Sequence, residues 1–97
     1  MATEKTRDSA ESSILFPRLE CWNPDKNIAT IAATVNKERV LCHISLKTLI
    51  AKFGASKNSP MRSVVENRVE IQAAAKELIK KRNYEEDGSV FVRDRDL

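Results

Sequence analysis

The stretch IATIAATVNKERVLCHI, residues 28–44, decides the fold class of this chain. Its first half alternates apolar with other residues, and the apolar series is Ala29, Ile31, Ala33 and Val35. Its second half places Val40, Cys42 and Ile44 on one side. Alternation of this kind is typical of a strand that buries one face. Because residues 36–39 are polar and of hairpin-loop length, we predict a hairpin of strands 28–35 and 40–44.

The apolar positions also predict how the two strands pair. If Val35 lies opposite Val40, then Ala33 meets Cys42 and Ile31 meets Ile44 on the same face. His43, the only histidine, then points to the other face, with Ala32 as its expected neighbour. No residue nearby in the sequence would orient its ring or take its proton. We therefore interpret His43 as a structural histidine.

Two helices are predicted after the hairpin. Ser45 can cap the first, whose apolar stripe is followed by Gly54, a residue suited to the left-handed end of a helix. Ser59 as N-cap and Pro60 at the first helical position begin the second. This second helix should run to about Arg82, because Lys80, Lys81 and Arg82 suit the negative end of the helix dipole.

The rest of the chain completes one small domain. Residues 1–13 are polar and aperiodic, which predicts a disordered N-terminal tail. Short strands are expected over residues 14–16 and 89–93, and residues 94–97 read as a charged C-terminal tail. We thus predict a single domain over residues 14–93, of class α+β. It would have two layers, a small antiparallel sheet with two helices on one face, in the order β-β-β-α-α-β.

Composition excludes several classes of protein. The chain has 97 residues, of which 32% are charged and 41% hydrophobic, with a net charge of +3. No apolar run approaches the roughly 20 residues that span a bilayer, so we expect no membrane segment. Without a signal-peptide pattern, we expect a cytoplasmic protein with Cys21 and Cys42 as free thiols. Neither cysteine has partners at metal-binding spacing, so no metal site is predicted.

An ordered set of short motifs runs through the chain. It comprises Ile14-Leu15-Phe16-Pro17, Trp22-Asn23, Cys42-His43-Ile44-Ser45, Phe53-Gly54, Asn67-Arg68 and Asp87-Gly88. In this set the chain resembles the small bacterial proteins grouped as domain-of-unknown-function family 1488, over residues 14–93. The resemblance implies the same two-layer β-β-β-α-α-β fold and supplies no activity, substrate or cofactor. Asn23 stands where an acid is expected after the tryptophan, which argues against chemistry by such a pair.

The usual signatures of an enzyme are not found in the sequence. No serine lies in a G-x-S-x-G elbow, and with only Gly54 and Gly88 there is no phosphate-binding loop. Neighbouring carboxylates occur at residues 85–87, in a predicted turn, where solvated charge is the ordinary interpretation. We expect no catalytic residue and no cofactor.

One arginine falls where the second helix should be apolar. Arg68 lies near the middle of the apolar stripe, and Gln72 lies one turn further on. Its stem could pack on the core while the guanidinium binds a carbonyl or a carboxylate near a sheet edge. Alternatively, Arg68 and Gln72 could line a small polar pocket for an anionic or planar ligand.

Two further groups are candidates for binding. Phe16, Trp22 and Tyr84 could form an exposed patch for another protein, or close the edge of a small core. A basic cluster could contact nucleic acid or simply complement the helix dipole, and it consists of Lys76, Lys80, Lys81 and Arg82. We predict a non-catalytic protein-interaction or accessory module that uses a sheet edge or the Trp22 region. The alternative is a weak nucleic-acid binder that uses the basic second helix.

Overall fold

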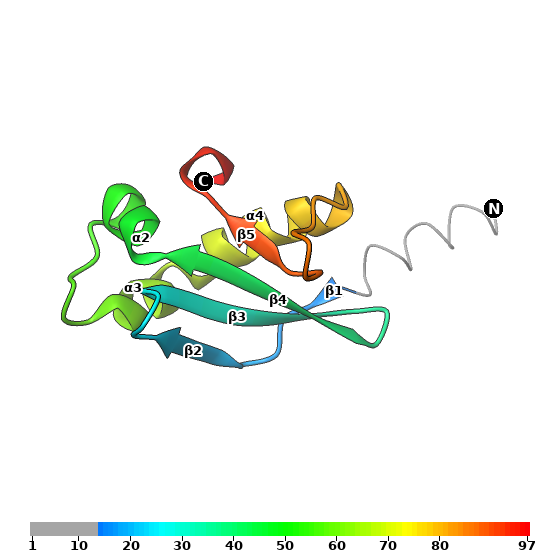
Figure 1. Cartoon of the computed structure of the whole chain (residues 1–97), viewed down its shortest axis with the longest axis horizontal. Helices are drawn as coiled ribbons and strands as arrows, with labels where there is room; N and C mark the ends of the chain where they lie inside the picture. The colour runs from blue at the N-terminus through cyan, green and yellow to red at the C-terminus, as the bar shows by residue number, and fades with distance from the viewer. Residues whose placement is uncertain (1–13) are drawn as a thin grey trace.

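The computed structural model describes residues 14–97, and the tail predicted at residues 1–13 lies outside this range. Five strands and three helices make up the domain (Figure 1). The strands are β1 (Ile14–Leu15), β2 (Glu20–Asn23), β3 (Ile28–Val35), β4 (Glu38–Ser45) and β5 (Val90–Val92). The helices are α2 (Leu46–Phe53), α3 (Pro60–Glu66) and α4 (Arg68–Lys80), and a short 3-10 helix, η1, spans Asp94–Asp96.

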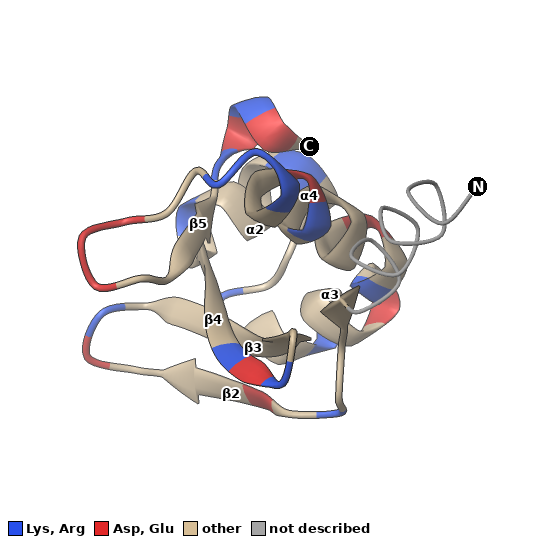
Figure 2. Cartoon of the chain, turned by 90° about the vertical axis from the view of Figure 1, so that its right-hand side faces the viewer, with Lys and Arg blue, Asp and Glu red and all other residues tan. Residues whose placement is uncertain are grey.

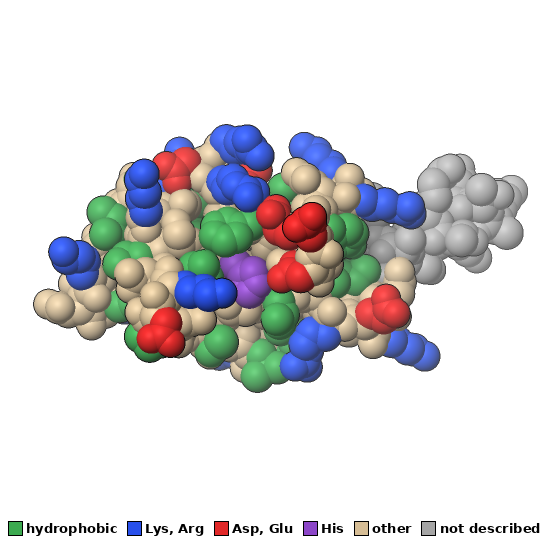
Figure 3. Space-filling view, in the orientation of Figure 1, with side chains coloured by type: hydrophobic (Ala, Val, Ile, Leu, Met, Phe, Trp, Pro, Cys, Tyr) green, Lys and Arg blue, Asp and Glu red, His purple; other side chains and the backbone are tan. Residues whose placement is uncertain are grey.

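The predicted α+β class and its two layers are confirmed. The strands form one sheet in the order β1-β3-β4-β5, and β2 pairs with β3 beside β1. The helices lie on one side of the curved sheet (Figure 2). Between the layers lies a core whose largest fully buried side chains are Ile44, Leu49, Ile71, Val64, Val90, Val92 and Cys42. The other face of the sheet carries no helix, and Figure 3 shows it from the front with His43 near its centre.

The sheet is mixed, whereas an antiparallel sheet was predicted. β5 runs parallel to β4, with Cys42 opposite Val90 and Ile44 opposite Val92. The three helices between these strands form the long crossover that parallel neighbours need. The prediction of an antiparallel sheet was therefore wrong for β5. The sequence of a three-residue strand does not indicate the direction in which the strand runs.

The hairpin exists as predicted, but its register differs by two residues. Val35 lies opposite Glu38, and Ala33 opposite Val40. The connection is a two-residue turn, Asn36 and Lys37, both with positive φ of 52° and 72°. Such a turn follows the right-handed twist of the strands, so the ladder continues through polar residues that were assigned to a longer loop.

The new register also changes the neighbour of His43. Thr30, rather than Ala32, lies opposite it. The Thr30 hydroxyl Oγ1 lies 2.8 Å from His43 Nδ1. A side chain from the facing strand therefore holds the ring, which agrees with a positional role for this histidine.

Both ends of α2 follow the sequence signals, and Pro60 begins α3 as predicted, but the predicted N-cap Ser59 makes no side-chain cap hydrogen bond. Ser45 accepts a hydrogen bond from the Thr48 backbone at the start of α2, and Gly54 ends that helix with a φ of 65°. The predicted second helix is divided into α3 and α4 at Asn67, which has a φ of −114°. The Asn67 side-chain amide donates to the Ser63 carbonyl at 2.9 Å, a local bond that competes with regular helix geometry.

The C-terminal residues are ordered, although they were expected to be a charged tail. Asp96 accepts a hydrogen bond from the Arg93 backbone at 2.8 Å and so stabilises η1. Leu97 then packs against the core. The folded part of the chain therefore extends past the predicted boundary at residue 93.

Candidate functional site

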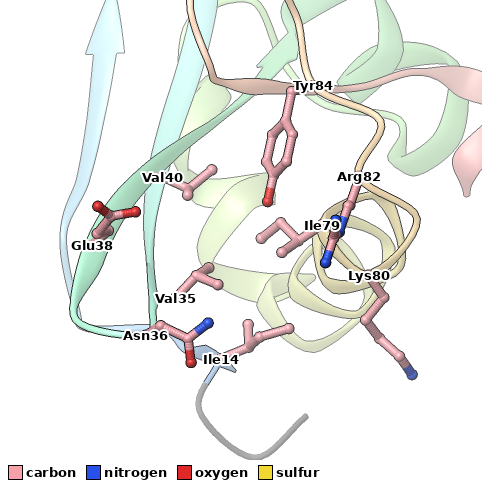
Figure 4. A pocket seen from close by; sticks show the side chains of 9 residues that line it. All are labelled: Ile14, Val35, Asn36, Glu38, Val40, Ile79, Lys80, Arg82 and Tyr84. Carbon is pink, nitrogen blue, oxygen red and sulfur yellow. The ribbon is translucent and has the colours of Figure 1, made fainter. Parts of the chain in front are cut away.

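A hollow at the hairpin end of the domain combines an apolar floor with a charged rim (Figure 4). We call it the Tyr84 hollow; its volume is about 450 Å³. Its lining residues come from β1, the β3–β4 hairpin, the end of α4 and the segment after α4. They are Ile14, Val35, Asn36, Glu38, Val40, Ile79, Lys80, Arg82 and Tyr84.

The floor exists because the hairpin extends beyond the helix that covers it. Ile14 pairs with Val35 at the end of the sheet, and Val40 lies on the same face as the core residue Cys42. α4 ends at Lys80, so these three apolar side chains are only partly buried. Figure 4 shows the Tyr84 ring pointing into the space between Val40 and Ile79.

The end of α4 determines where Arg82 lies. The backbone N–H of Arg82 bonds the Ile79 carbonyl, and that of Asn83 bonds the Leu78 carbonyl. This pattern is a Schellman motif, whose left-handed position usually holds glycine. Arg82 occupies it with a φ of 56°, which costs roughly 1–2 kcal/mol for a residue with a side chain. The local backbone would thus favour glycine here, although the chain carries an arginine.

The rim offers polar groups that other described residues do not engage. Within residues 14–97, no ion pair or side-chain hydrogen bond involves Arg82, Glu38 or the Tyr84 hydroxyl. Tyr84 is 40% exposed. A cation, an anion and a phenol therefore surround the apolar floor and are available to a ligand.

The basic cluster predicted from the sequence borders this hollow. Lys80 and Arg82 line it. Lys76 lies one helical turn before Lys80, and Lys81 follows Lys80 directly at the end of α4. Lys80 also forms an ion pair with Glu77 at 3.5 Å. Two of the four cations, Lys80 and Arg82, therefore lie at the Tyr84 hollow.

The three aromatic residues of the predicted interaction patch do not form one surface. Trp22 lies opposite Ala29 on β3, whereas the Tyr84 hollow begins at Val35. These two positions are six residues apart along β3, which is about 20 Å. Phe16 and Trp22 pack against the core, and Tyr84 alone lines the hollow.

Arg68 is held by a carboxylate from a neighbouring strand. Its guanidinium donates from Nε to Oε2 of Glu20 at 2.7 Å and from Nη2 to Oε1 at 3.0 Å. Both side chains are mostly buried, with 23% and 16% exposed. Hydrogen bonding from Arg68 lowers the pKa of Glu20 although burial acts in the other direction. Gln72, the predicted companion in a polar pocket, is half-buried one turn further on.

Replacing Glu20 by glutamine is expected to destabilise the protein at neutral pH and to matter less in acid. Because the folded-state pKa is lowered, the charged pair stabilises the fold above the ordinary carboxyl pKa of about 4, and this contribution is lost as the pH falls through the lowered value. Urea unfolding midpoints of wild type and Glu20→Gln should converge on acidification. Glu70→Gln, at an exposed position on α4, is the matched control. A gap that stays constant with pH would contradict this role of the pair.

Sequence reasoning missed two features of these sites. Glu20 was not considered, although it lies one alternation before Trp22 and therefore on the helix-bearing face of the sheet. Glu38 was placed in a loop, although it lines the hollow from β4. An acid in register with core positions is the signal that could have identified Glu20.

The described part of the chain contains neither a metal-binding cluster nor a membrane-spanning helix. Within residues 14–97, no three His, Cys, Asp or Glu side chains gather closely enough to hold a metal ion. No helix in that part of the chain is long and apolar enough to cross a membrane. Burial raises the pKa of the Cys42 thiol to about 12, so this cysteine is unreactive.

Comparison with known proteins gives one family and one fold. The family model described as "Protein of unknown function (DUF1488)" matches residues 14–92. No curated protein matches the chain. A crystal structure from Shewanella loihica, of a protein of unknown function from the DUF1488 family, is similar with a TM-score of 0.76 and 19% sequence identity. The alignment covers 84% of this chain and 93% of that one, so the two share the fold.

Proposed function

We propose that this chain, which belongs to the DUF1488 family of proteins of unknown function, is a non-catalytic module that binds an acidic, apolar segment of another protein. The segment would occupy the Tyr84 hollow. The observation that carries the proposal is the combination of an apolar floor with a rim cation, Arg82, that no described carboxylate pairs.

The floor can supply affinity through an apolar anchor. Ile14, Val35, Val40 and Ile79 form a surface on which one aliphatic or aromatic side chain can be buried. Full burial of such a side chain stabilises a complex by about 1.5–3 kcal/mol. Tyr84 adds a ring beside the anchor and a hydroxyl that can bond the backbone of the segment.

The rim charges give the segment an orientation. Acidic side chains are favoured beside Arg82 and the lysines at the end of α4. Glu38 lies on the hairpin side of the hollow, where it favours a backbone N–H or a basic residue. The expected ligand therefore carries its acids on one side of the anchor only.

The absence of catalysis is part of the proposal. The nine residues that line the hollow include one carboxylate and no histidine, cysteine or serine. Acyl transfer needs a nucleophile with a base, and glycoside hydrolysis needs paired carboxylates. We also propose a cytoplasmic location, since Cys21 and Cys42 are free thiols and disulfides are rare there.

Nucleic-acid binding by the basic cluster is the less favoured alternative. Glu38 lies at the hollow and Glu77 pairs with Lys80, so both carboxylates reduce the positive field. A surface that binds the phosphate backbone of a nucleic acid depends on positive charge, so the apolar floor of the hollow would have no role in such binding. If nucleic acid were the ligand, affinity for an oligonucleotide should fall by orders of magnitude between about 50 and 200 mM salt.

Selection from a random peptide library tests the proposal. The full chain is the bait, at about physiological salt, where attraction over more than the Debye length of about 8 Å is screened but direct contacts with the rim charges remain. We expect enriched peptides to share one large apolar residue followed or preceded by Asp or Glu. With Arg82→Glu as bait, the preference for acids should disappear. Enrichment of basic peptides by the wild-type chain, or of none, would contradict the proposed function.

A further inference from the structure

A second hollow lies on the face of the sheet that carries no helix. Thr30, His43 and Phe91 stand side by side across β3, β4 and β5 and form its floor. The His43 and Phe91 rings are tilted by 52° with centroids 6.2 Å apart. The volume is about 460 Å³. We call this the His43 hollow, and it is separate from the Tyr84 hollow, which lies on the other face.

Opposite charges occupy diagonal corners of the His43 hollow. Lys26 belongs to the turn before Ile28, which lies opposite Ser45, so it lies at the α2 end of the strands. Glu86 and Asp87 precede β5, which is parallel to β4, so they lie toward the hairpin end and on the β5 side. Figure 3 shows acidic side chains on one side of the histidine and a basic side chain on the other.

The acidic loop is held in place by bonds that leave one carboxylate unpaired. Asp87 accepts hydrogen bonds from the Ser89 backbone at 3.0 Å and the Ser89 hydroxyl at 2.6 Å. Glu85 pairs with Arg93 at 3.4 Å. Among residues 14–97, neither Glu86 nor the Lys26 side chain forms an ion pair. Lys26 and Glu86, the two charges of the hollow without an ion pair, therefore have opposite signs and lie at diagonal corners.

The surface around the hollow is apolar in part. Leu41 and Leu19 are 43% and 47% exposed, and both line a small groove on this face, next to Cys21. Leu15, which pairs with Thr34 at the end of β3, is 60% exposed. Exposed leucines on a sheet face without helices are typical of a surface that packs against protein.

We propose that this face binds the same face of a second copy of the chain, around a two-fold axis near His43. When this axis lies in the interface, perpendicular to the line from Lys26 to Glu86, it places each of these two corners against the diagonal corner of the partner's hollow. Lys26 of each copy then lies against Glu86 and Asp87 of its partner. Because the dimer is symmetric, this pairing of opposite charges occurs at two places in the interface. The leucines of the two copies meet in the same interface.

The size of the face predicts a weak dimer. β3 and β4 have eight residues each, and β1, β2 and β5 have two, four and three, so the 25 strand residues cover about 400 Å² at about 3.3 Å each in strands about 4.8 Å apart. Two copies then bury about 800 Å² through the strands, which is below the range of stable interfaces and typical of a weak, transient contact. A dissociation constant on the order of 100 µM is expected for such a contact.

Charge reversal in the full chain tests this arrangement by sedimentation equilibrium. Lys26→Glu and Glu86→Lys each place like charges together at two positions in the dimer, so each should weaken association at least tenfold. The double variant Lys26→Glu with Glu86→Lys restores opposite charges and should return to within about threefold of wild type. Lys57→Glu and Glu70→Lys, which lie off this face, are matched controls that should leave association unchanged.

Three results would overturn the proposal. One is a wild-type chain that remains monomeric at concentrations far above the expected constant. Another is association that survives either single reversal. The third is a double variant that associates no better than the single variants. All four positions changed are exposed or half-exposed, and circular dichroism with urea unfolding verifies that each variant is folded.

Discussion

Tyr84→Ala is expected to weaken binding of the selected acidic, apolar peptide by about thirtyfold. The ring points into the hollow beside Val40 and Ile79, and loss of a central aromatic contact costs about 2 kcal/mol or more in a small interface. Because Tyr84 is 40% exposed, its removal should leave the fold intact. Isothermal titration calorimetry with wild type and variant measures the change.

The matched control for this prediction is Val69→Ala. Val69 is 80% exposed on α4 and lies outside the lining of the hollow. Its replacement removes apolar surface of similar character without touching the site, so peptide affinity should stay within about twofold. Equal losses for Tyr84→Ala and Val69→Ala would mean that the peptide does not bind in the hollow.

Leu49→Ala is expected to reduce the free energy of unfolding by about 2–5 kcal/mol. Leu49 is fully buried, at 0% exposed, where α2 packs against the sheet. Its removal leaves a cavity in the core, and two of the three core residues on β3, Ala29 and Ala33, are too small to fill it. Denaturant unfolding of the two proteins gives the difference.

Ile50→Ala provides the comparison on the same helix. Ile50 follows Leu49 directly but is 40% exposed. Its replacement should cost less than about 1 kcal/mol. If the two substitutions destabilise the protein equally, the assignment of α2's buried face is incorrect.

The hairpin shows how far local pattern predicts this fold. Alternation over residues 28–35 identified β3, and the apolar positions of residues 40–44 identified β4. The register was wrong because Glu38 and Arg39 were read as loop, although a two-residue turn brings them into the strand. Polarity alone does not separate a loop from the exposed end of a long hairpin.

Two other features depend on contacts that lie far apart in the sequence. The parallel direction of β5 results from the crossover through the helices, which the sequence VFV does not encode. The partner of Arg68 is Glu20, 48 residues away. Sequence reasoning did offer a carboxylate near a sheet edge as one interpretation of Arg68, but the identity of that carboxylate needed the tertiary structure.

The Tyr84 hollow could not be located from sequence for the same reason. Ile14 and Ile79 come from opposite ends of the domain, and each was an ordinary core candidate by pattern. The basic cluster and Tyr84 were both recognised, as two separate candidates. They meet because the Schellman motif at Arg82 turns the chain back over the end of the hairpin.

The two proposed surfaces are compatible with each other. The Tyr84 hollow lies on the helix-bearing side of the sheet, and the His43 hollow lies on the other. A dimer through the second would present two copies of the first, so a partner with two acidic segments would bind more tightly than one with a single segment.

The most direct test of the central claim is a titration of the isotopically labelled chain with the selected peptide, followed by amide chemical shifts. We expect shifts concentrated at Val35, Val40, Ile79, Arg82 and Tyr84, with Thr30 and His43 unchanged at protein concentrations below dimerisation. Shifts centred on the open face of the sheet, on Trp22, or spread along the exposed side of α4 would contradict it.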